Sequence, residues 1–301
     1  MDSNSFKKIA VAGSGVLGAQ IAFHTALNGY EVSVYDITEE ALNRGRIAME
    51  KNFSEYINDF GIECEELERS LDSINFTTNL ADAVADADLL IEAVPEKIDI
   101  KKDFYSQLAD VAPEKTIFAT NSSTLLPSSF MEATRRPDRF LALHFANKIW
   151  SLNTAEVMRT SKTSDEVFRK VSAFATSIGM VALELNKEQP GYILNTLMVP
   201  FLDAALTLYG RGVADYKTID KTWMKGTNSN AGPFGFFDVI GLNTVYNIHK
   251  TKAEQANDKD HLEAVEKLKT EFIDKNKLGV ATGEGFYKYP NPEFKNEDFL
   301  K

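Results

Sequence analysis

Residues 7–18 read KKIAVAGSGVLG, and this pattern predicts the fold of the first part of the chain. The run KKIAVA is typical of a buried β-strand, and the residues that follow, AQIAFHTALNG, carry apolar side chains at helical spacing. A strand, a glycine-rich turn and a helix in this order open a βαβ unit that binds a dinucleotide. Gly13 permits the tight turn, Gly15 lets a pyrophosphate approach bare backbone, and Gly18 lets the helix lie close to the strand. The alternative is a glycine turn that binds nothing.

The next predicted strand, EVSVYD, ends on Asp36. An acid at this distance from the glycine turn accepts both ribose hydroxyls of the adenosine, which selects NAD. An NADP site would need a cation nearby for the 2′-phosphate, and Ile37 and Thr38 offer none. Arg44 and Arg46 are expected to lie too far along the following helix.

Strands and helices alternate through the first 185 residues or so. The later strands are predicted at INFTT, DLLIEAV, TIFAT, FLALHF, AEVMRT and MVALEL. This order predicts an α/β fold with a Rossmann-type, doubly wound and mostly parallel sheet. A helical insertion of about residues 38–72 separates the second strand from the third, and it could be a partner arm or a substrate lid.

After residues 186–191, NKEQPG, helical periodicity dominates to the end of the chain. We therefore predict an NAD-binding domain over residues 1–187 and an all-helical C-terminal domain, for substrate binding and dimerisation, over residues 188–301. The helix that begins near Tyr192 is apolar nearly all round, but Asn195, Pro200 and Asp203 interrupt it. A buried core helix or dimer helix explains this composition better than a bilayer span.

The composition is that of a globular protein with an acidic surface. The chain has 301 residues, 44% of them hydrophobic, and a formal net charge of −11. Neither nucleic acid nor an anionic membrane would attract such a surface, so we expect neither as a partner. The first residues, MDSNSFKKIAV, lack the apolar core of a signal peptide. We expect a cytoplasmic protein.

The cysteine and the histidines give no sign of a metal site. Cys64 is the only cysteine, so it can close no disulfide within the chain and build no thiolate metal site, which fits a reducing compartment. The four histidines are scattered along the sequence without metal-ligand spacing. We expect no metal, and no functional role for His24, His249 or His261.

His144 is different because it ends the predicted strand FLALHF, and Glu156 opens the strand that follows. An imidazole at the carboxyl end of a strand, with a carboxylate to hold its other nitrogen, is a general acid/base suited to neutral pH. The alternative is that His144 is a core histidine and Glu156 a surface acid.

Other polar residues should join His144, because ligands of a doubly wound sheet bind beyond the carboxyl ends of its strands. Residues 121–124, NSST, and residues 93–96, AVPE, both follow predicted strands. We expect both segments beside the nicotinamide. In alcohol oxidation His144 would act as the base, oriented by Glu156, with Ser123 and Asn195 holding the substrate oxygen. In ketone reduction protonated His144 would deliver the proton.

Nearly the whole chain resembles the 3-hydroxyacyl-CoA dehydrogenase family. The segments GSGVLG, IEAVPEKIDIKKDFYSQL, TIFATNSSTL, RPDRFLALHF, PGYILNTLMVP, GPFGFFDVIGL and GEGFYKY each resemble a family motif, in the family's order. The resemblance implies a catalytic set of Ser123, His144, Glu156 and Asn195, a substrate cleft between the domains, and a homodimer formed mainly by the helical domain. The residues then expected to contact NAD are Gly13, Gly15, Val16, Leu17, Gly18, Asp36, Ile37, Ala93, Val94, Glu96, Lys101, Asn121, Ser123 and Asn147.

Two departures concern the substrate. The family usually follows its histidine with Phe-Phe-Asn-Pro, whereas this chain has FANKIW over residues 145–150, in which it resembles the diketoreductase branch. A large indole at Trp150 would narrow the substrate cleft; core packing is the alternative. The second departure is the charge of residues 50–72, which hold eight acids but only Lys51 and Arg69 as cations. A polyanion such as CoA would be repelled there.

Three functions remain open. The first is an NAD-dependent 3-hydroxyacyl-CoA dehydrogenase acting on a small 3-hydroxy or 3-keto thioester. The second is a reductase of 3-keto or 3,5-diketo compounds that carry no CoA, which fits Trp150 and the acidic insertion. The third is a catalytically silent protein that binds NAD as a sensor or structural element.

Overall fold

The computed structural model describes residues 6–301, which form two compact units. The first unit ends at Ile193 and the second begins at Leu194. The division falls later than the predicted boundary after residue 187. The reason is that Tyr192 and Ile193, at the start of the long helix, bond to side chains and backbone of the first unit.

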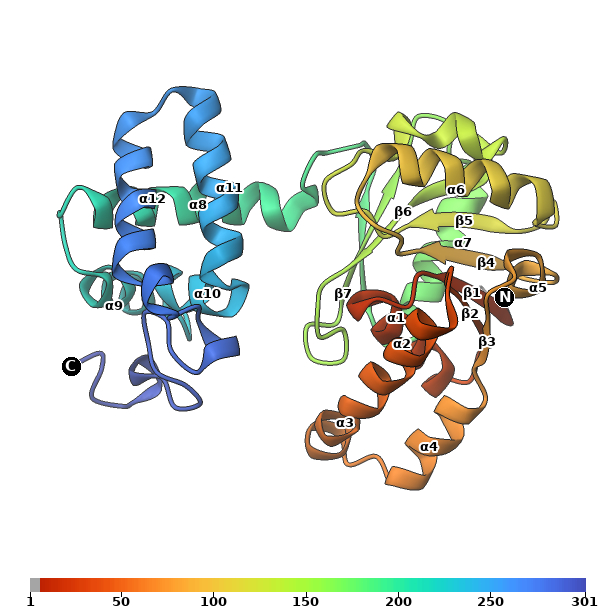
Figure 1. Ribbon diagram of the computed structural model, residues 1–301, viewed down its shortest axis with the longest axis horizontal. Coiled ribbons are helices and arrows are strands. Elements are labelled where there is room, and N and C mark those ends of the chain that lie inside the picture. Colours follow the sequence, from red (N-terminus) through yellow and green to blue (C-terminus); the bar gives the residue numbers. More distant parts are fainter. Residues whose placement is uncertain (1–5) are drawn as a thin grey trace. The chain divides into compact units, whose positions relative to one another are not determined.

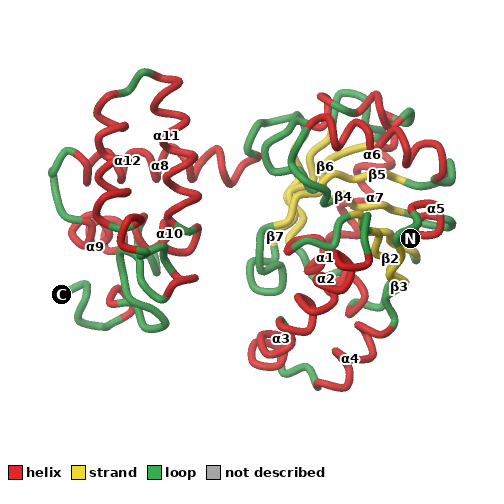
Figure 2. The backbone as a smooth tube through the Cα atoms, in the orientation of Figure 1, coloured by secondary structure: helices red, strands yellow, loops and turns green. Residues whose placement is uncertain are grey.

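The first unit contains an eight-stranded sheet (Figures 1 and 2). The strand order is β3-β2-β1-β4-β5-β6-β7-β8, and all neighbours are parallel except β6 and β7. This confirms the predicted mostly parallel, doubly wound sheet. The strands are β1 (Lys8–Ala12), β2 (Glu31–Tyr35), β3 (Asn75–Thr77), β4 (Leu89–Glu92), β5 (Ile117–Thr120), β6 (Phe140–Phe145), β7 (Thr154–Arg159) and β8 (Val181–Leu185).

Helices cover both faces of the sheet because its strands are apolar on both sides. Ile9 and Val11 of β1 belong to the cluster that includes α1, α4 and α7. Ala10 and Ala12, which point the other way, pack with α5 and α6. These helices and the remaining two are α1 (Val16–Leu27), α2 (Glu39–Lys51), α3 (Phe53–Phe60), α4 (Cys64–Asp72), α5 (Leu80–Val84), α6 (Ile98–Val111) and α7 (Asp165–Ser177).

The predicted insertion consists of α2, α3 and α4, of which α3 and α4 extend away from the sheet (Figure 1). Helix α2 begins at a side-chain cap, because Thr38 accepts a hydrogen bond from the Ala41 N–H. Helix α3 ends at Gly61, whose φ of 68° suits the left-handed conformation that glycine tolerates.

The second unit is helical, as predicted. It consists of α8 (Tyr192–Gly210), α9 (Tyr216–Thr227), α10 (Pro233–Ile240), α11 (Leu242–Ala256) and α12 (Lys259–Glu271), followed by short 3₁₀ turns. Among residues 6–301, α8 is the one helix long and apolar enough to cross a bilayer by length and composition. Leu202, Ala205 and Leu206 of α8 nevertheless pack in the core of this unit.

The histidines of the helical unit form a cluster that the sequence pattern does not predict. His249 on α11 and His261 on α12 are 3% and 5% exposed, and their rings face each other. Asp203 of α8 lies beside both. The sequence does not show this cluster, because it forms only where three helices pack together. His24, in the first unit, contacts Tyr56 Oη and the Ile178 carbonyl oxygen and is a packing residue.

Candidate active site

The antiparallel register of β6 and β7 places His144 directly opposite Glu156. His144 Nδ1 lies 3.2 Å from Glu156 Oε2, and the two residues are 8% and 4% exposed. Because its acceptor is a carboxylate, Nδ1 carries the proton and Nε2 is left as an acceptor. The pair is therefore the predicted imidazole and its orienting acid, and Glu156 is not a surface acid.

The loop after β5 supplies the hydroxyl that faces the imidazole. Ser123 Oγ lies 3.1 Å from His144 Nε2. Asn121 fixes the base of this loop, because its Oδ1 accepts a hydrogen bond of 2.9 Å from the Phe145 N–H of β6. The structure thus joins Ser123, His144 and Glu156 in one chain of hydrogen bonds. Asn195 lies on α8 in the second unit, and its place in the catalytic set stays a prediction.

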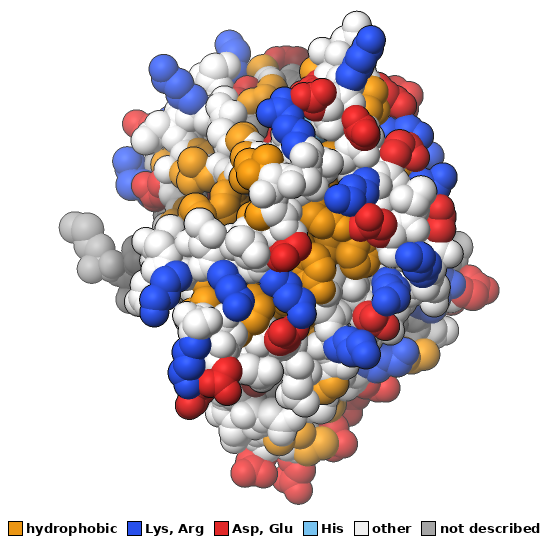
Figure 3. All heavy atoms as spheres, turned by 90° about the vertical axis from the view of Figure 1, so that its left-hand side faces the viewer, with side chains coloured by type: hydrophobic (Ala, Val, Ile, Leu, Met, Phe, Trp, Pro, Cys, Tyr) orange, Lys and Arg blue, Asp and Glu red, His pale blue; other side chains and the backbone are white. Residues whose placement is uncertain are grey.

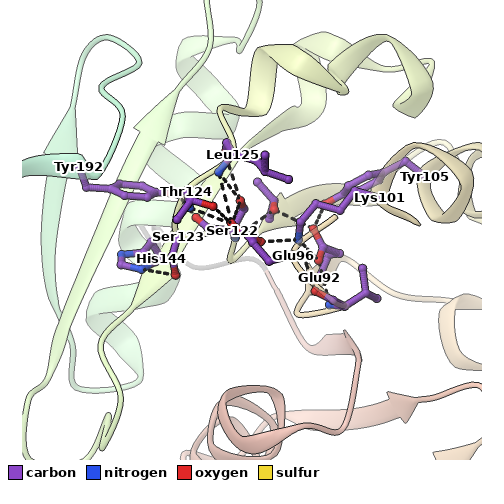
Figure 4. A network of polar contacts seen from close by, with 12 residues as sticks. Glu92, Glu96, Lys101, Tyr105, Ser122, Ser123, Thr124, Leu125, His144 and Tyr192 are labelled. Atoms are coloured by element: carbon purple, nitrogen blue, oxygen red, sulfur yellow. Dashed lines mark hydrogen bonds and ion pairs between the residues drawn. The ribbon is translucent and has the colours of Figure 1, made fainter. Parts of the chain in front are cut away.

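Tyr192 was not foreseen as a site residue, although it lies within the segment PGYILN. Its ring stacks on His144 with the centroids 4.3 Å apart, and its hydroxyl donates a 2.6 Å hydrogen bond to the Ser122 carbonyl oxygen (Figure 4). Burial, followed by the charge of Glu156, raises the pKa of the Tyr192 hydroxyl. Tyr192 therefore stays neutral and acts as a wall that fixes the plane of the imidazole.

The backbone after Tyr192 also holds the orienting acid. The Ile193 N–H donates a hydrogen bond of 2.9 Å to Glu156 Oε1, while Oε2 faces the imidazole. Each carboxylate oxygen of Glu156 thus has a contact of its own, which fixes its rotamer.

A second polar network lies beside the loop that carries Ser123 (Figure 4). Lys101 Nζ lies 2.6 Å from Glu92 Oε1 and 3.3 Å from Glu96 Oε2, and the side chain of Lys101 is only 1% exposed. Direct contact between Lys101 and NAD does not fit this burial. Its ammonium group instead compensates the buried carboxylate of Glu92, a residue that the sequence analysis missed because no local pattern marks it.

Glu96 links this network to the loop of Ser123. Its Oε1 accepts hydrogen bonds from Ser122 Oγ at 2.6 Å and from the Thr124 N–H at 2.8 Å. Burial raises the pKa of Glu96, but these hydrogen bonds and the charge of Lys101 outweigh it and lower the pKa to about 2. Glu96 is therefore ionised at neutral pH, and it anchors the loop that presents Ser123.

The glycine loop leaves open backbone where a pyrophosphate would bind. A Cβ added at Gly15 would meet no heavy atom within 4 Å, and the φ of Gly15 is −63°, so neither packing nor conformation requires glycine there. Helix α1 starts without a side-chain cap, which leaves its first amide groups available to an anion. Gly13 has a φ of 99°, and a Cβ on Gly18 would lie 1.9 Å from the Gly13 carbonyl oxygen. These roles are the predicted ones, and the loop fits a dinucleotide.

A cavity of about 910 Å³ extends from the glycine loop past Asp36. Asp36 Oδ2 accepts hydrogen bonds of 2.7 Å from both the N–H and the hydroxyl of Ser14, which fixes the carboxylate at the cavity wall. The predicted residues Gly13, Gly15, Val16, Ile37, Ala93 and Val94 also line it. Leu17 instead packs against the apolar core.

Arg44 corrects one expectation, because it lines the same cavity as Asp36. Helix α2 brings its first turns back to the glycine loop, where a Cβ on Gly45 would lie only 2.7 Å from Ser14 Cβ. Arg46 points elsewhere and binds Asp72, with its Nη2 2.6 Å from Oδ1.

The last two predicted residues lie in the loop after β6. Asn147 is exposed, and its Oδ1 accepts a 2.8 Å hydrogen bond from Gln20 Nε2 on α1. Trp150 is 5% exposed and packs against Tyr56 of α3, with the ring centroids 5.3 Å apart. The indole is therefore a core residue that holds the insertion, and the expectation that it narrows the cleft by direct contact is corrected.

Comparison with known proteins agrees with this geometry. The family model of the 3-hydroxyacyl-CoA dehydrogenase NAD-binding domain matches residues 8–189, and that of the C-terminal domain matches residues 191–289. The human mitochondrial hydroxyacyl-coenzyme A dehydrogenase is 34% identical over 292 residues, which cover 94% of this chain and 91% of that protein. A probable 3-hydroxybutyryl-CoA dehydrogenase of Deinococcus radiodurans is 34% identical over 94% of this chain and 100% of its own length.

Two solved structures show the same fold. A diketoreductase, described for dual catalysis of dicarbonyl compounds, is 50% identical with a TM-score of 0.90, and the match covers 94% of this chain and 99% of that one. The (S)-3-hydroxybutyryl-CoA dehydrogenase of Ralstonia eutropha is 28% identical with a TM-score of 0.81, over 95% of this chain and 100% of that one. The chain therefore belongs to the 3-hydroxyacyl-CoA dehydrogenase family, with an NAD-binding sheet unit and a helical C-terminal unit.

Proposed function

We propose that this protein interconverts the 3-hydroxy and 3-keto groups of a small molecule with NAD(H) as cofactor. The observation that carries the proposal is the chain of contacts from Glu156 through both nitrogens of His144 to Ser123 Oγ. This arrangement leaves Nε2 as the nitrogen that exchanges a proton. A catalytically silent NAD-binding protein would not need this chain of contacts.

In the reducing direction, protonated His144 holds a proton at Nε2 and delivers it to the substrate oxygen. Glu156 remains ionised and stabilises the imidazolium until the proton leaves. Ser123 O–H donates to the same oxygen, so the developing negative charge meets two donors. NADH, when bound at the glycine loop, supplies the hydride.

An NADH-oxidation assay tests the proposal. The wild type should oxidise NADH in the presence of a 3-keto ester or acetoacetyl-CoA, and Ser123→Ala should slow turnover roughly tenfold. The absence of NADH oxidation with every 3-keto compound tried would favour the silent alternative.

We further propose that the preferred substrate is not a CoA thioester. Similarity to the diketoreductase supports it, as does the charge of α3 and α4. Two cations near these helices already have acidic partners, because Arg46 binds Asp72 and Lys148 Nζ lies 3.6 Å from Glu55 Oε1. A surface with this excess of acids repels the phosphates of CoA.

The test compares acetoacetyl-CoA with an uncharged keto ester of similar acyl size and with a diketo ester. The thioester should have the lower kcat/KM, and added salt should relieve part of the deficit by screening. A low KM for acetoacetyl-CoA that rises with salt would restore the ordinary thioester substrate.

We also propose that the protein is a homodimer through its helical unit. Large apolar side chains of this unit are exposed, among them Leu197 at 69%, Val239 at 67% and Ile248 at 46%. Figure 3 shows apolar side chains gathered on the face that Figure 1 turns to the left, with charged residues around them. Exposed apolar side chains on several helices of one unit support an interface with a second copy of the chain. Light scattering should give the mass of a dimer for the wild type and of a monomer for Leu197→Glu.

Finally, we propose a cytoplasmic location. Cys64 is exposed and the chain has no second cysteine, which suits a reducing compartment. Cell fractionation with an antibody to the protein tests this.

A further inference from the structure

The core of the helical unit contains a group of metal-ligating side chains that the proposed reaction does not use. Asp203 of α8, His249 of α11 and His261 of α12 each offer one ligand atom, and these atoms lie within 4.8 Å of one another. We propose that Asp203, His249 and His261 bind a divalent transition-metal ion of the Zn²⁺ class.

The distances support this assignment. His249 Nδ1 lies 3.2 Å from His261 Nε2, and Asp203 Oδ1 lies 3.4 Å from His261 Nε2 and 2.7 Å from His249 Nδ1. Ligands bound tetrahedrally at about 2.0–2.1 Å are separated from one another by roughly 3.3 Å. Two of the three separations match this value, and the third needs to open by about half an ångström.

The state of Asp203 Oδ1 also points to a cation. This oxygen is buried and accepts no hydrogen bond, although two imidazole nitrogens lie close to it. The ring nitrogens are therefore near the carboxylate without directing an N–H at it. A buried acceptor without a donor is costly, and a metal ion would satisfy it.

A neighbouring hydroxyl prepares His261 as a ligand. Thr207, one turn beyond Asp203 on α8, has its Oγ1 3.0 Å from His261 Nδ1. When Nδ1–H donates to this hydroxyl, Nε2 keeps its lone pair for the metal. The Asp258 carboxylate fixes the same turn of α12, because its Oδ1 accepts the His261 N–H at 3.0 Å.

The donor set defines the class of ion. One carboxylate oxygen and two imidazole nitrogens suit Zn²⁺, Co²⁺ or Ni²⁺ better than Ca²⁺ or Mg²⁺, which prefer oxygen alone. Three protein ligands leave a fourth position for water. Because the ligands come from three helices, the ion would link α8, α11 and α12. The site lies wholly in the helical unit and does not depend on the proposed reaction.

Lys252 should lower the affinity of the proposed site for a metal ion. Its ammonium group contacts Asp203 Oδ2, the oxygen that faces away from the histidines, and its side chain is 47% exposed. A positive charge beside the carboxylate opposes a second cation. Removing this charge should therefore tighten metal binding, which a purely structural polar cluster does not predict.

The experiment uses the full-length protein, freed of metal with a chelator and titrated with Co²⁺. The wild type should bind one equivalent with the visible absorption of a tetrahedral Co²⁺ centre, and Zn²⁺ should displace it. Asp203→Asn and His261→Gln should each weaken binding at least tenfold, and Thr207→Val by roughly tenfold. His144→Gln serves as the matched control, because it removes the other histidine–carboxylate pair and should leave the absorption unchanged.

Lys252→Met distinguishes the site from effects of misfolding. Misfolding would weaken Co²⁺ binding, whereas replacement of this exposed residue should strengthen it several-fold. Circular dichroism confirms that each variant is folded. The proposal is overturned if the wild type shows no saturable Co²⁺ or Zn²⁺ binding, if Lys252→Met does not strengthen binding, or if the absorption disappears in His144→Gln and persists in His261→Gln.

Discussion

The sheet unit and the helical unit both bury carboxylates, but they use them differently. Glu156 of the sheet unit holds one nitrogen of His144 and leaves the other facing a serine hydroxyl. In the helical unit, Asp238 accepts hydrogen bonds from the Phe286 and Tyr287 N–H groups, both at 2.8 Å, and from Tyr289 Oη. Under the proposed function, the same buried group thus serves a reaction in one unit, whereas it fixes a chain segment in the other.

Burial of a carboxylate does not by itself indicate a reactive site. Asp220 resembles Asp238, because it accepts the Phe234 and Gly235 N–H groups and the Tyr287 hydroxyl. Its partners are donors with no further chemistry. Glu156 differs from both because its partner, His144, keeps a second titratable nitrogen, which faces the Ser123 hydroxyl.

The largest effect should come from the imidazole itself. His144→Ala removes the proton donor, so kcat should fall by about a hundredfold to ten-thousandfold while the Kd for NADH changes little. Steady-state kinetics and NADH fluorescence measure the two quantities. His24→Gln, which replaces a packing histidine of the same unit, should keep its turnover. A near-normal kcat in His144→Ala would contradict the role of His144 as the proton donor.

The corresponding change in the helical unit should affect stability rather than chemistry. Asp238→Ala leaves two buried backbone N–H groups without an acceptor, which should lower the free energy of unfolding by about 3 kcal/mol. Chemical denaturation measures it. Asp260→Ala is the control, because it breaks an exposed ion pair with Arg211 and should cost less than about 1 kcal/mol. Equal losses in the two variants would contradict the anchoring role of Asp238.

A conservative change tests the orienting acid. Glu156→Gln keeps an acceptor for Nδ1–H but removes the charge that favours imidazolium, so kcat should fall about tenfold. In the oxidation direction the acid limb of the pH–rate profile should move to lower pH, because His144 then takes up its proton only in more acidic solution. An unchanged profile would show that Glu156 acts by packing alone.

Cofactor choice should respond to Asp36 and Arg44. Asp36→Ala removes a charge that repels a 2′-phosphate, while Arg44 remains in the same cavity. The ratio of kcat/KM for NADPH to that for NADH should rise about tenfold, equivalent to ~1.4 kcal/mol. Adding Arg44→Ala should cancel most of the gain. A wild type that uses NADPH as well as NADH would contradict the role of Asp36.

The stability of the helical unit should also depend on pH. Burial raises the pKa of both Asp220 and Asp238 to about 6, against an ordinary value of 3.8. The folded state binds these protons more tightly than the unfolded state, so this contribution is present below about pH 4 and is lost as pH rises through 6. The loss between pH 4.5 and 7 should be roughly 2 kcal/mol for each of the two carboxyl groups, which denaturation curves at these two pH values measure. Asp220→Asn should reduce it, and a loss that stays the same in that variant would assign it to other groups.

The features that depend on local pattern can be predicted from the sequence. The strand, glycine turn and helix around Gly13 and Gly18 follow from residue types within one short segment, since backbone conformation and apolar periodicity act locally. The pairing of His144 with Glu156 was also predicted, because both lie on strands that succeed each other along the chain, and the antiparallel register seen in the structure brings them opposite each other.

Contacts between side chains that are distant in the sequence depend on how the elements pack. Tyr192 reaches His144 from 48 positions along the chain, Arg44 reaches the cavity of Asp36 because Gly45 lets α2 approach, and Trp150 enters the core because Tyr56 covers it. The cluster of Asp203, His249 and His261 likewise exists only where three helices pack. Periodicity shows which face of an element is buried, but it does not show which other element covers that face, and packing between distant segments makes this choice.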